Sequence, residues 1–209
     1  MGFAVIAGWW PEAAINIPWD VWIVTWIAAA LWKNRTLKRP GGGREWTYRI
    51  LEVGGYILLL FLFVSNEKAR ISGRPLMDFL FHRFWYLPAG AGWAMVLLAT
   101  AGFAFCWWAR LHLGRLWSGR ITRKEGHHII DTGPYAVVRH PIYTGILTAV
   151  IATALVKGAV HALIGAALLI VAYWMKARLE ERFLREELGA AAYDDYSRRV
   201  PMLIPFLKF

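Results

Sequence analysis

Cysteine and acidic residues are both scarce in this 209-residue chain. Cys106 is the only cysteine, which excludes an intrachain disulfide and any cysteine-based zinc cage. Charged residues make up 18% of the sequence, against about 25% in an ordinary soluble domain. No lysine or arginine precedes Lys33, so no basic region stands ahead of the first apolar run. We therefore expect no cleavable signal peptide and a first apolar run that stays in the protein.

Long hydrophobic runs are abundant. Hydrophobic residues account for 58% of the chain and aromatic residues for 15%, with thirteen tryptophans and a mean hydropathy of +0.40. Five apolar segments stand out, at residues 13–32, 50–64, 90–109, 142–156 and 158–174. This pattern is typical of an integral membrane protein with about five transmembrane helices. Because only Lys157 separates the last two segments, we expect a tight helical hairpin that crosses the bilayer or turns within its far interface.

Basic residues outnumber acidic ones by 24 to 14, and they gather at the ends of the apolar segments. This placement favours contact with anionic lipid headgroups over binding to nucleic acid. With the N-terminus outside, the cytoplasmic loops and tail carry 19 lysines and arginines and the opposite side carries 5. The positive-inside rule therefore predicts an external N-terminus and a cytoplasmic C-terminus. The composition, rich in alanine, arginine and tryptophan, is typical of a high-GC prokaryote, and we expect its cytoplasmic membrane as the location.

Residues 113–145 form a first polar block, LGRLWSGRITRKEGHHIIDTGPYAVVRHPIYTG. Its glycines and Pro134 favour turns, so we expect much of it to be a loop that can wrap a ligand. Pro141 suits the first position of a helix, whose free N–H groups attract anions. Arg139 and Tyr143 also have a simpler interpretation, as a basic anchor and an aromatic residue at the membrane surface. The three histidines have no carboxylate at ligand spacing, so we expect no metal site.

Residues 176–205 form a second polar block, KARLEERFLREELGAAAYDDYSRRVPMLIP, which continues the fifth apolar segment. At helical spacing Glu181 shares a face with several arginines, and Lys176 and Glu180 form an i,i+4 pair. On composition alone this block is an exposed helix with ion pairs. The hairpin, however, returns this helix to the side of His140, so charged groups converge on an aromatic, histidine-rich loop. Convergent polar groups beside an apolar cavity are typical of a ligand site.

The two blocks together resemble the isoprenylcysteine carboxyl methyltransferases and the wider group of phospholipid and small-molecule membrane methyltransferases. The motifs that carry the resemblance are LGRLWS, HHIIDTGPYAVVRHPIYTG, and RLEE with the tail VPMLIP, over residues 113–207. This similarity implies a membrane-embedded enzyme that binds S-adenosylmethionine at the cytoplasmic face and releases S-adenosylhomocysteine. The first two apolar segments carry no motif of the family.

Site residues follow from the resemblance position by position. It implies a cofactor site made by His127, His128, Ile129, Ile130, Tyr135, Arg139, His140, Pro141, Ile142, Tyr143 and Glu180. It implies Lys176, Arg178 and Glu181 as catalytic residues, and either Glu180 or Glu181 as the acidic residue that helps close the cofactor pocket. The family places an arginine about one turn before its glutamate, and here Lys176 precedes Glu180 by four residues while Arg178 precedes Glu181 by three. The residue that faces the acceptor is therefore open between Lys176 and Arg178.

These residue types suit methyl transfer from a sulfonium. Aromatic faces attract the cation, and a helix start with a nearby histidine or arginine can hold the carboxylate of the cofactor. A carboxylate acceptor is already nucleophilic, whereas an amine or thiol needs a glutamate or histidine to take its proton. A hydrophobic acceptor would enter sideways from the bilayer through a gap between helices.

Two other functions stay open. Membrane sterol reductases resemble the same C-terminal half but use NAD(P)H, and a non-catalytic membrane scaffold would bind neither cofactor. The Arg-His-Pro triplet, the paired glutamates and the short chain favour methyl transfer. We therefore expect an all-α integral membrane methyltransferase, with three membrane helices in residues 1–112 and the catalytic and cofactor-binding half in residues 113–209. Its expected partners are membrane lipids and a hydrophobic methyl acceptor, with no nucleic acid and no metal.

Overall fold

A computed structural model of the protein describes residues 11–29, 36–38, 44–60, 75–117, 123–124 and 129–207. Helices make up most of these residues: α2 (Asn16–Ala29), α3 (Arg44–Leu60), α5 (Pro75–Leu80), α6 (Ala89–Leu113), α7 (Pro134–Val137), α8 (Pro141–Lys157), α9 (Val160–Leu188) and α10 (Ala190–Arg199), with the 3₁₀ turn η2 (Gly114–Leu116). Two very short strands, β1 (Thr36–Lys38) and β2 (Arg123–Lys124), pair antiparallel. The predicted all-α class is therefore confirmed for the described part of the chain.

Each of the five predicted apolar segments overlaps a helix: α2, α3, α6, α8 or α9. The ends of the first two segments, residues 30–32 and 61–64, lie outside the described residues. Among the described residues, α6 and α9 are long and apolar enough to cross a membrane, by length and composition. Helix α8 is apolar but has only 17 residues. These helices support a membrane protein, while the number of five spans and their orientation stay predictions.

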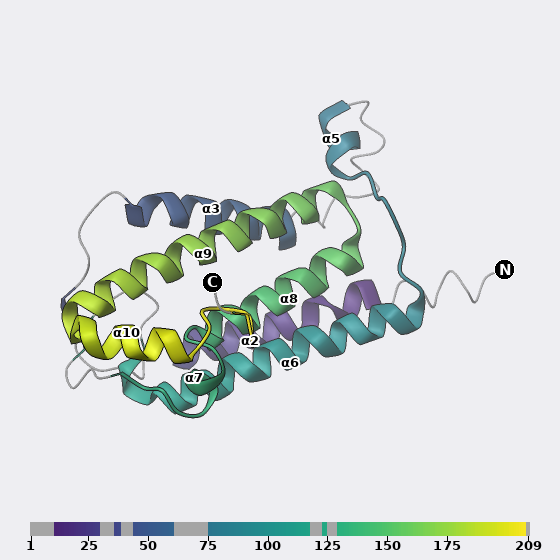
Figure 1. The fold of residues 1–209 in the computed structure, drawn as a ribbon. Helices are drawn as coiled ribbons and strands as arrows, with labels where there is room; N and C mark the ends of the chain where they lie inside the picture. Colours follow the sequence, from purple (N-terminus) through teal and green to yellow (C-terminus); the bar gives the residue numbers. More distant parts are fainter. Residues whose placement is uncertain are drawn as a thin grey trace.

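Glycines allow the helices to approach one another closely. A Cβ on Gly102 of α6 would meet the carbonyl oxygen of Gly145 on α8 at 2.6 Å, and one on Gly55 of α3 would meet Cγ of Leu169 on α9 at 2.7 Å. Small residues of this kind bring helix backbones together where lipid offers no hydrophobic driving force. Helix α9 consequently packs between α3 on one side and α8 on the other (Figure 1).

The predicted hairpin joins α8 to α9 through Gly158. This residue has a φ of 58°, a conformation that glycine adopts at little cost, and its N–H donates to the carbonyl of Ala154. The loop before α6 runs beside the turn, with Phe84 N–H donating to Gly158 O and Val160 N–H donating to His82 O. The turn sends α9 back along α8, so the charged C-terminal part of α9 lies beside the start of α8, as the hairpin predicts.

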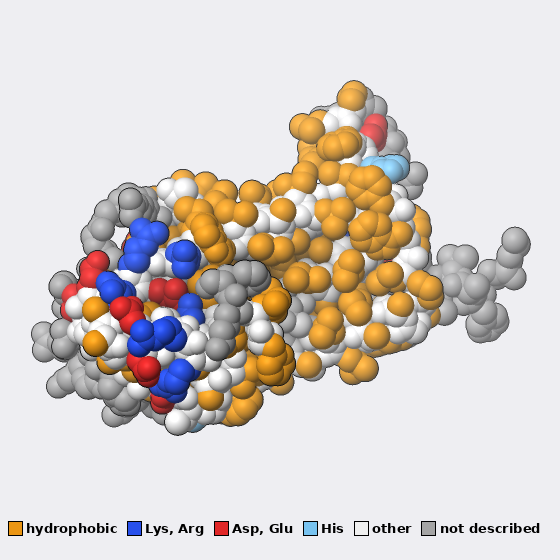
Figure 2. All heavy atoms as spheres, in the orientation of Figure 1, with side chains coloured by type: hydrophobic (Ala, Val, Ile, Leu, Met, Phe, Trp, Pro, Cys, Tyr) orange, Lys and Arg blue, Asp and Glu red, His pale blue; other side chains and the backbone are white. Residues whose placement is uncertain are grey.

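The surface divides into a charged end and a hydrophobic remainder. In Figure 2 the lysines, arginines and carboxylates gather at one end, over α10 and the C-terminal part of α9, whereas orange side chains cover most of the rest of this face. Val24 and Ile27 of α2 and Leu97 of α6 are among the large apolar side chains that are exposed. An exposed apolar surface of this extent suits contact with lipid.

Candidate active site

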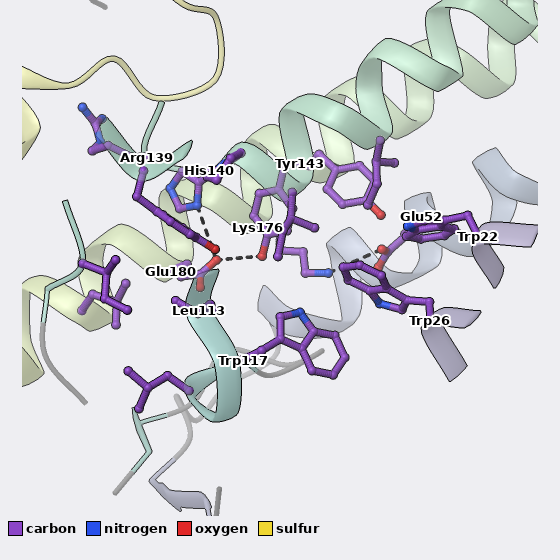
Figure 3. Close-up of a pocket in the computed structure, with 18 of the residues that line it drawn as sticks. Trp22, Trp26, Glu52, Leu113, Trp117, Arg139, His140, Tyr143, Lys176 and Glu180 are labelled. Atoms are coloured by element: carbon purple, nitrogen blue, oxygen red, sulfur yellow. Dashed lines mark hydrogen bonds and ion pairs between the residues drawn. The ribbon is translucent and has the colours of Figure 1, made fainter. Parts of the chain in front are cut away.

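A cavity of about 510 Å³ lies among α2, α3, α8, α9, α10 and the segment around α7. Pockets for small molecules usually measure roughly 300–1,000 Å³. Its wall is aromatic and apolar where α2 contributes, and it carries charged groups where α8 meets α9 (Figure 3). The cavity thus offers both an apolar side and a polar side to a ligand.

The start of α8 forms the polar edge of the cavity. His140 is the residue that caps α8 and Pro141 is its first helical residue, so the predicted helix start is confirmed. The backbone N–H groups of Arg139 and His140 donate to the carbonyl oxygens of Pro201 and Met202, at 2.8 and 3.1 Å. The VPM segment after α10 is therefore bound to the RHP segment before α8, and the two sequence motifs form one structural unit.

Arg139 and Glu181 form a buried clamp behind this edge. Arg139 Nε donates to Glu181 Oε1 at 2.6 Å, and its Nη1 donates to the backbone oxygens of Ser197 and Val200. Burial by itself raises the pKa of the Glu181 carboxyl, but hydrogen bonds and charge from His140 and Arg139 outweigh burial and lower the pKa to about 2. Glu181 lies in the charged part of α9, beyond its apolar stretch. The clamp ties the C-terminal tail to α9.

Glu180, one position earlier, lines the cavity. Tyr143 Oη donates to Glu180 Oε2 at 2.7 Å, and His140 Nδ1 lies 3.6 Å from the same oxygen. The rings of His140 and Tyr143 stack nearly parallel, with centroids 5.3 Å apart. A carboxylate, an imidazole and a phenol therefore meet at one point of the wall (Figure 3).

Lys176, one helical turn before Glu180, brings a positive charge into the wall. Its Nζ lies 3.5 Å from Glu52 Oε1 of α3, and 5.2 and 5.3 Å from the ring centroids of Tyr143 and Tyr173. The carboxylate and the ring faces compensate a cation that is largely removed from water. In Figure 3 the Lys176 side chain points across to Glu52. We call these two residues the Glu52–Lys176 pair.

Apolar and aromatic residues line the cavity next to its charged groups. Ile129, Ile130 and Tyr135 line it from the segment that precedes α8. Tyr196 Oη of α10 donates to the backbone oxygen of Tyr135 at 2.8 Å, which holds this segment against α10. Burial raises the pKa of Tyr196, so its phenol stays a neutral donor. Such a surface suits a flat, weakly polar group.

Most of the predicted cofactor residues meet at this cavity. Its wall includes Ile129, Ile130, Tyr135, Arg139, His140, Pro141, Ile142, Tyr143 and Glu180, and also Lys176. His127 and His128 lie outside the described residues. Arg178 and Glu181 are not part of the wall, and the Arg178 guanidinium lies 5.9 Å from the Trp174 ring centroid instead. Within the described ranges, no three His, Cys, Asp or Glu side chains form a group that could hold a metal.

The N-terminal helices supply wall residues that the motifs did not indicate. Trp19, Trp22 and Trp26 of α2 line one side of the cavity, which we call the tryptophan wall, and Glu52 and Tyr56 line it from α3. Both groups of residues could have been noticed in the sequence. The three tryptophans are spaced three and four residues apart, and such residues share a helix face. Glu52 is an ionisable residue within an apolar segment, and such a residue usually marks a functional position.

Comparison with known proteins finds a family and several relatives. Residues 94–186 match the isoprenylcysteine carboxyl methyltransferase family. The chain is 47% identical over 75 residues to methanethiol S-methyltransferase 2 of Bradyrhizobium diazoefficiens, covering 35% of this chain and 27% of that protein. It is 29% identical over 89 residues to protein-S-isoprenylcysteine O-methyltransferase B of Arabidopsis thaliana, covering 42% and 45%. It is also 29% identical over 117 residues to the nickel-cobalt-cadmium resistance protein NccN of Alcaligenes xylosoxydans xylosoxydans, covering 55% and 53%.

These matches confirm the resemblance inferred from the motifs. The family match includes the start of α8 and the segment of α9 with Lys176 and Glu180, but it contains neither α2 nor α3 nor the C-terminal tail. The chain matches about half or less of the length of each relative. The wall residues from Ile129 to Glu180 therefore lie in the matched segment, whereas the tryptophan wall, Glu52 and the α10 residues Tyr193 and Tyr196 lie outside it.

Proposed function

We propose that the protein is a membrane methyltransferase that uses S-adenosylmethionine, because residues 94–186 match the isoprenylcysteine carboxyl methyltransferase family. The observation that carries this proposal is the convergence of His140, Tyr143 and Glu180 on one cavity, since all three belong to the matched segment. S-adenosylmethionine, when bound, supplies a methyl group on a positively charged sulfur. The protein has to supply position more than acid chemistry.

The residues present fit this cofactor. The Glu180 carboxylate and the Tyr143 ring offer negative charge and a π face to a sulfonium. Pro141 has no N–H, and the N–H of His140 donates to Met202 O. The N–H groups of Ile142 and Tyr143 follow, have no carbonyl one turn earlier in the helix, and can be offered to a carboxylate. Ile129 and Ile130 offer an apolar surface to a purine. Arg139 acts indirectly, because its guanidinium is engaged by Glu181 and the tail and thereby holds the RHP segment in place.

The methyl acceptor would lie between Lys176 and the tryptophan wall. Of the two basic residues that the motif left open, Lys176 lines the cavity, so we assign it the role of facing the acceptor. The apolar wall suits a hydrophobic or membrane-associated acceptor that enters from the bilayer. A carboxylate acceptor needs no proton removed, whereas an amine or thiol would give its proton to the Glu180 carboxylate or to His140.

Binding of tritiated S-adenosylmethionine to the purified protein tests the proposal. Glu180→Gln should weaken binding by at least about tenfold, because it removes one charge from the wall. Glu186→Gln is the matched control, since Glu186 lies exposed on the same helix and does not line the cavity. Retention of NADPH without S-adenosylmethionine would identify a reductase instead. Membranes incubated with the labelled cofactor would then show whether protein, lipid or small molecules gain the label.

A further inference from the structure

The Glu52–Lys176 pair is the one charged feature of the cavity wall, within the described residues, that joins an N-terminal helix to the family segment. Glu52 belongs to α3, whereas Lys176 lies in residues 94–186. The two side chains are 21% and 11% exposed, and 3.5 Å separates the carboxylate oxygen from the ammonium nitrogen. A salt bridge with so little exposure is weakly screened by water, so each charge strongly affects what can bind beside the other.

A lysine in an acceptor site ordinarily suits an anionic acceptor. Here the charge of Lys176 is already balanced by Glu52, and the faces of Tyr143 and Tyr173 lie beside it. A carboxylate that approached Lys176 would have to displace Glu52 or share the site with it. Like charges held close together in a poorly hydrated site are costly, so Glu52 acts against anionic ligands.

Neutral polar groups also line the cavity near the pair. Tyr56 Oη and Tyr173 Oη share a hydrogen bond of 2.8 Å and both residues line the cavity. Trp22 also lines it, and its Nε1 is buried with no hydrogen-bond partner among the described residues. This side of the cavity therefore offers hydroxyl and N–H groups, with no net charge from the pair, to a ligand that has lone pairs.

We propose that Glu52 is a specificity-determining residue that neutralises Lys176, so that the site accepts neutral, hydrophobic methyl acceptors and excludes carboxylates. The inference rests on the proposed function only in calling the bound molecule a methyl acceptor. Charge selection itself is a property of the pair and can be measured without methyl transfer.

Binding of two matched probes to the protein in lipid nanodiscs tests the proposal. 8-Bromooctan-1-ol is neutral and 8-bromooctanoate is anionic at neutral pH, and the bromine of either probe quenches the fluorescence of nearby tryptophans such as those of the tryptophan wall. The wild type should prefer the alcohol. In Glu52→Gln the affinity for the octanoate should rise about tenfold, because an uncompensated Lys176 gains a partner, while the alcohol affinity stays unchanged.

A neighbouring glutamate provides the control. Glu45 lies on the same helix, is also 21% exposed and is also paired with a cation, Arg49, but it does not line the cavity. Glu45→Gln makes the same change in net charge and should leave both affinities as in the wild type. An equal rise in octanoate affinity in Glu45→Gln, or no rise in Glu52→Gln, overturns the inference.

The reciprocal substitution provides a second test, which still applies if Glu52→Gln does not fold. Lys176→Gln leaves Glu52 without its cation, so 8-bromooctylammonium should bind about tenfold more tightly than it does to the wild type. No gain in ammonium affinity contradicts the pairing. Parallel measurement of S-adenosylmethionine binding separates the two ideas: a wild type without such binding counts against the proposed function, and unaltered probe selectivity counts against the role of Glu52.

Discussion

Two adjacent glutamates on α9 have different environments. Glu180 lines the cavity and accepts a hydrogen bond from Tyr143, whereas Glu181 accepts hydrogen bonds from Arg139 and His140 behind the wall. Successive helical residues point about 100° apart, since a turn takes 3.6 residues. The double replacement of both glutamates would therefore mix a loss of ligand contact with a loss of stability, and single replacements are needed to separate them.

Glu181→Gln should destabilise the fold and also reduce its sensitivity to acid. We expect the free energy of unfolding near neutral pH to fall by about 3 kcal/mol, because Arg139 is left buried without its anion. The pKa of Glu181 is lowered from 4.5 to about 2. A group with a lowered pKa stabilises the folded state above its ordinary pKa, and that contribution is lost as the pH falls from 4.5 towards 2. Thermal unfolding in detergent at about pH 5 and about pH 3 measures both effects.

The exposed pair of Arg185 and Asp194 is the control for this measurement. Its side chains are 52% and 41% exposed, so Asp194→Asn should change the unfolding midpoint little. If the wild type and Glu181→Gln lose the same stability between these pH values, Glu181 is not the group that titrates.

Pairs of helices hold the cavity together through close backbone contacts. Helix α3 reaches α9 where Gly55 faces Gly165 and Leu169. Glu52 lies almost one turn before Gly55, and Tyr56 directly follows Gly55. The contact of Gly55 with α9 therefore sets the positions of the wall residues Glu52 and Tyr56. The separation of α3 and α9 therefore controls both stability and the shape of the cavity.

Gly55→Ala and Gly54→Ala should behave differently although they are neighbours on one helix. A Cβ at position 55 would lie 3.0 Å from Gly165 O and closer still to Leu169, whereas a Cβ at position 54 meets nothing within 4 Å. We expect Gly55→Ala to destabilise the protein by about 1–3 kcal/mol through overpacking. Gly54→Ala should be neutral or stabilising by up to about 1 kcal/mol, because alanine favours a helix. Equal unfolding midpoints for the two variants would show that α3 does not pack as described.

The molecule as a whole has a charged end and a hydrophobic surface, and the cavity reaches the charged end. Residues of α10 and of the C-terminal part of α9 form that end and also line the cavity, among them Leu188 and Tyr193. A cofactor that is soluble in water would approach from this end, whereas an acceptor that is soluble in lipid would approach across the apolar surface. The positive-inside rule predicts that the charged end is cytoplasmic.

Cysteine labelling tests this orientation. Cys106 is buried, so the natural chain gives little background. Arg198→Cys places a thiol at an exposed position on α10, and His82→Cys places one in the exposed loop at the opposite end. A membrane-impermeant maleimide should label position 82 in intact cells and position 198 only after permeabilisation. The opposite pattern would mean that the N-terminus is cytoplasmic.

Short-range features of the chain were sufficient to predict most of the fold. Hydropathy located five helices, Pro141 marked the start of α8, and the single residue between two apolar runs predicted the hairpin. These features are local, because a missing N–H, a backbone turn and a run of apolar side chains act within a few residues. Nine of the residues that the motifs indicated for the cofactor also line one cavity, and their role in binding it stays a prediction.

Contacts between distant segments could not be predicted in this way. Neither the rotation of α9 that turns Glu180 inward and Glu181 away, nor the approach of Glu52 to Lys176, follows from spacing along one helix. Both depend on how α3 and α8 pack on opposite sides of α9. That packing depends on the shapes of side chains far apart in the sequence: Glu52 and Lys176, for example, are 124 residues apart. The sequence was thus enough to predict the helices and the resemblance to the family, whereas helix packing determines which charged side chains meet in the cavity.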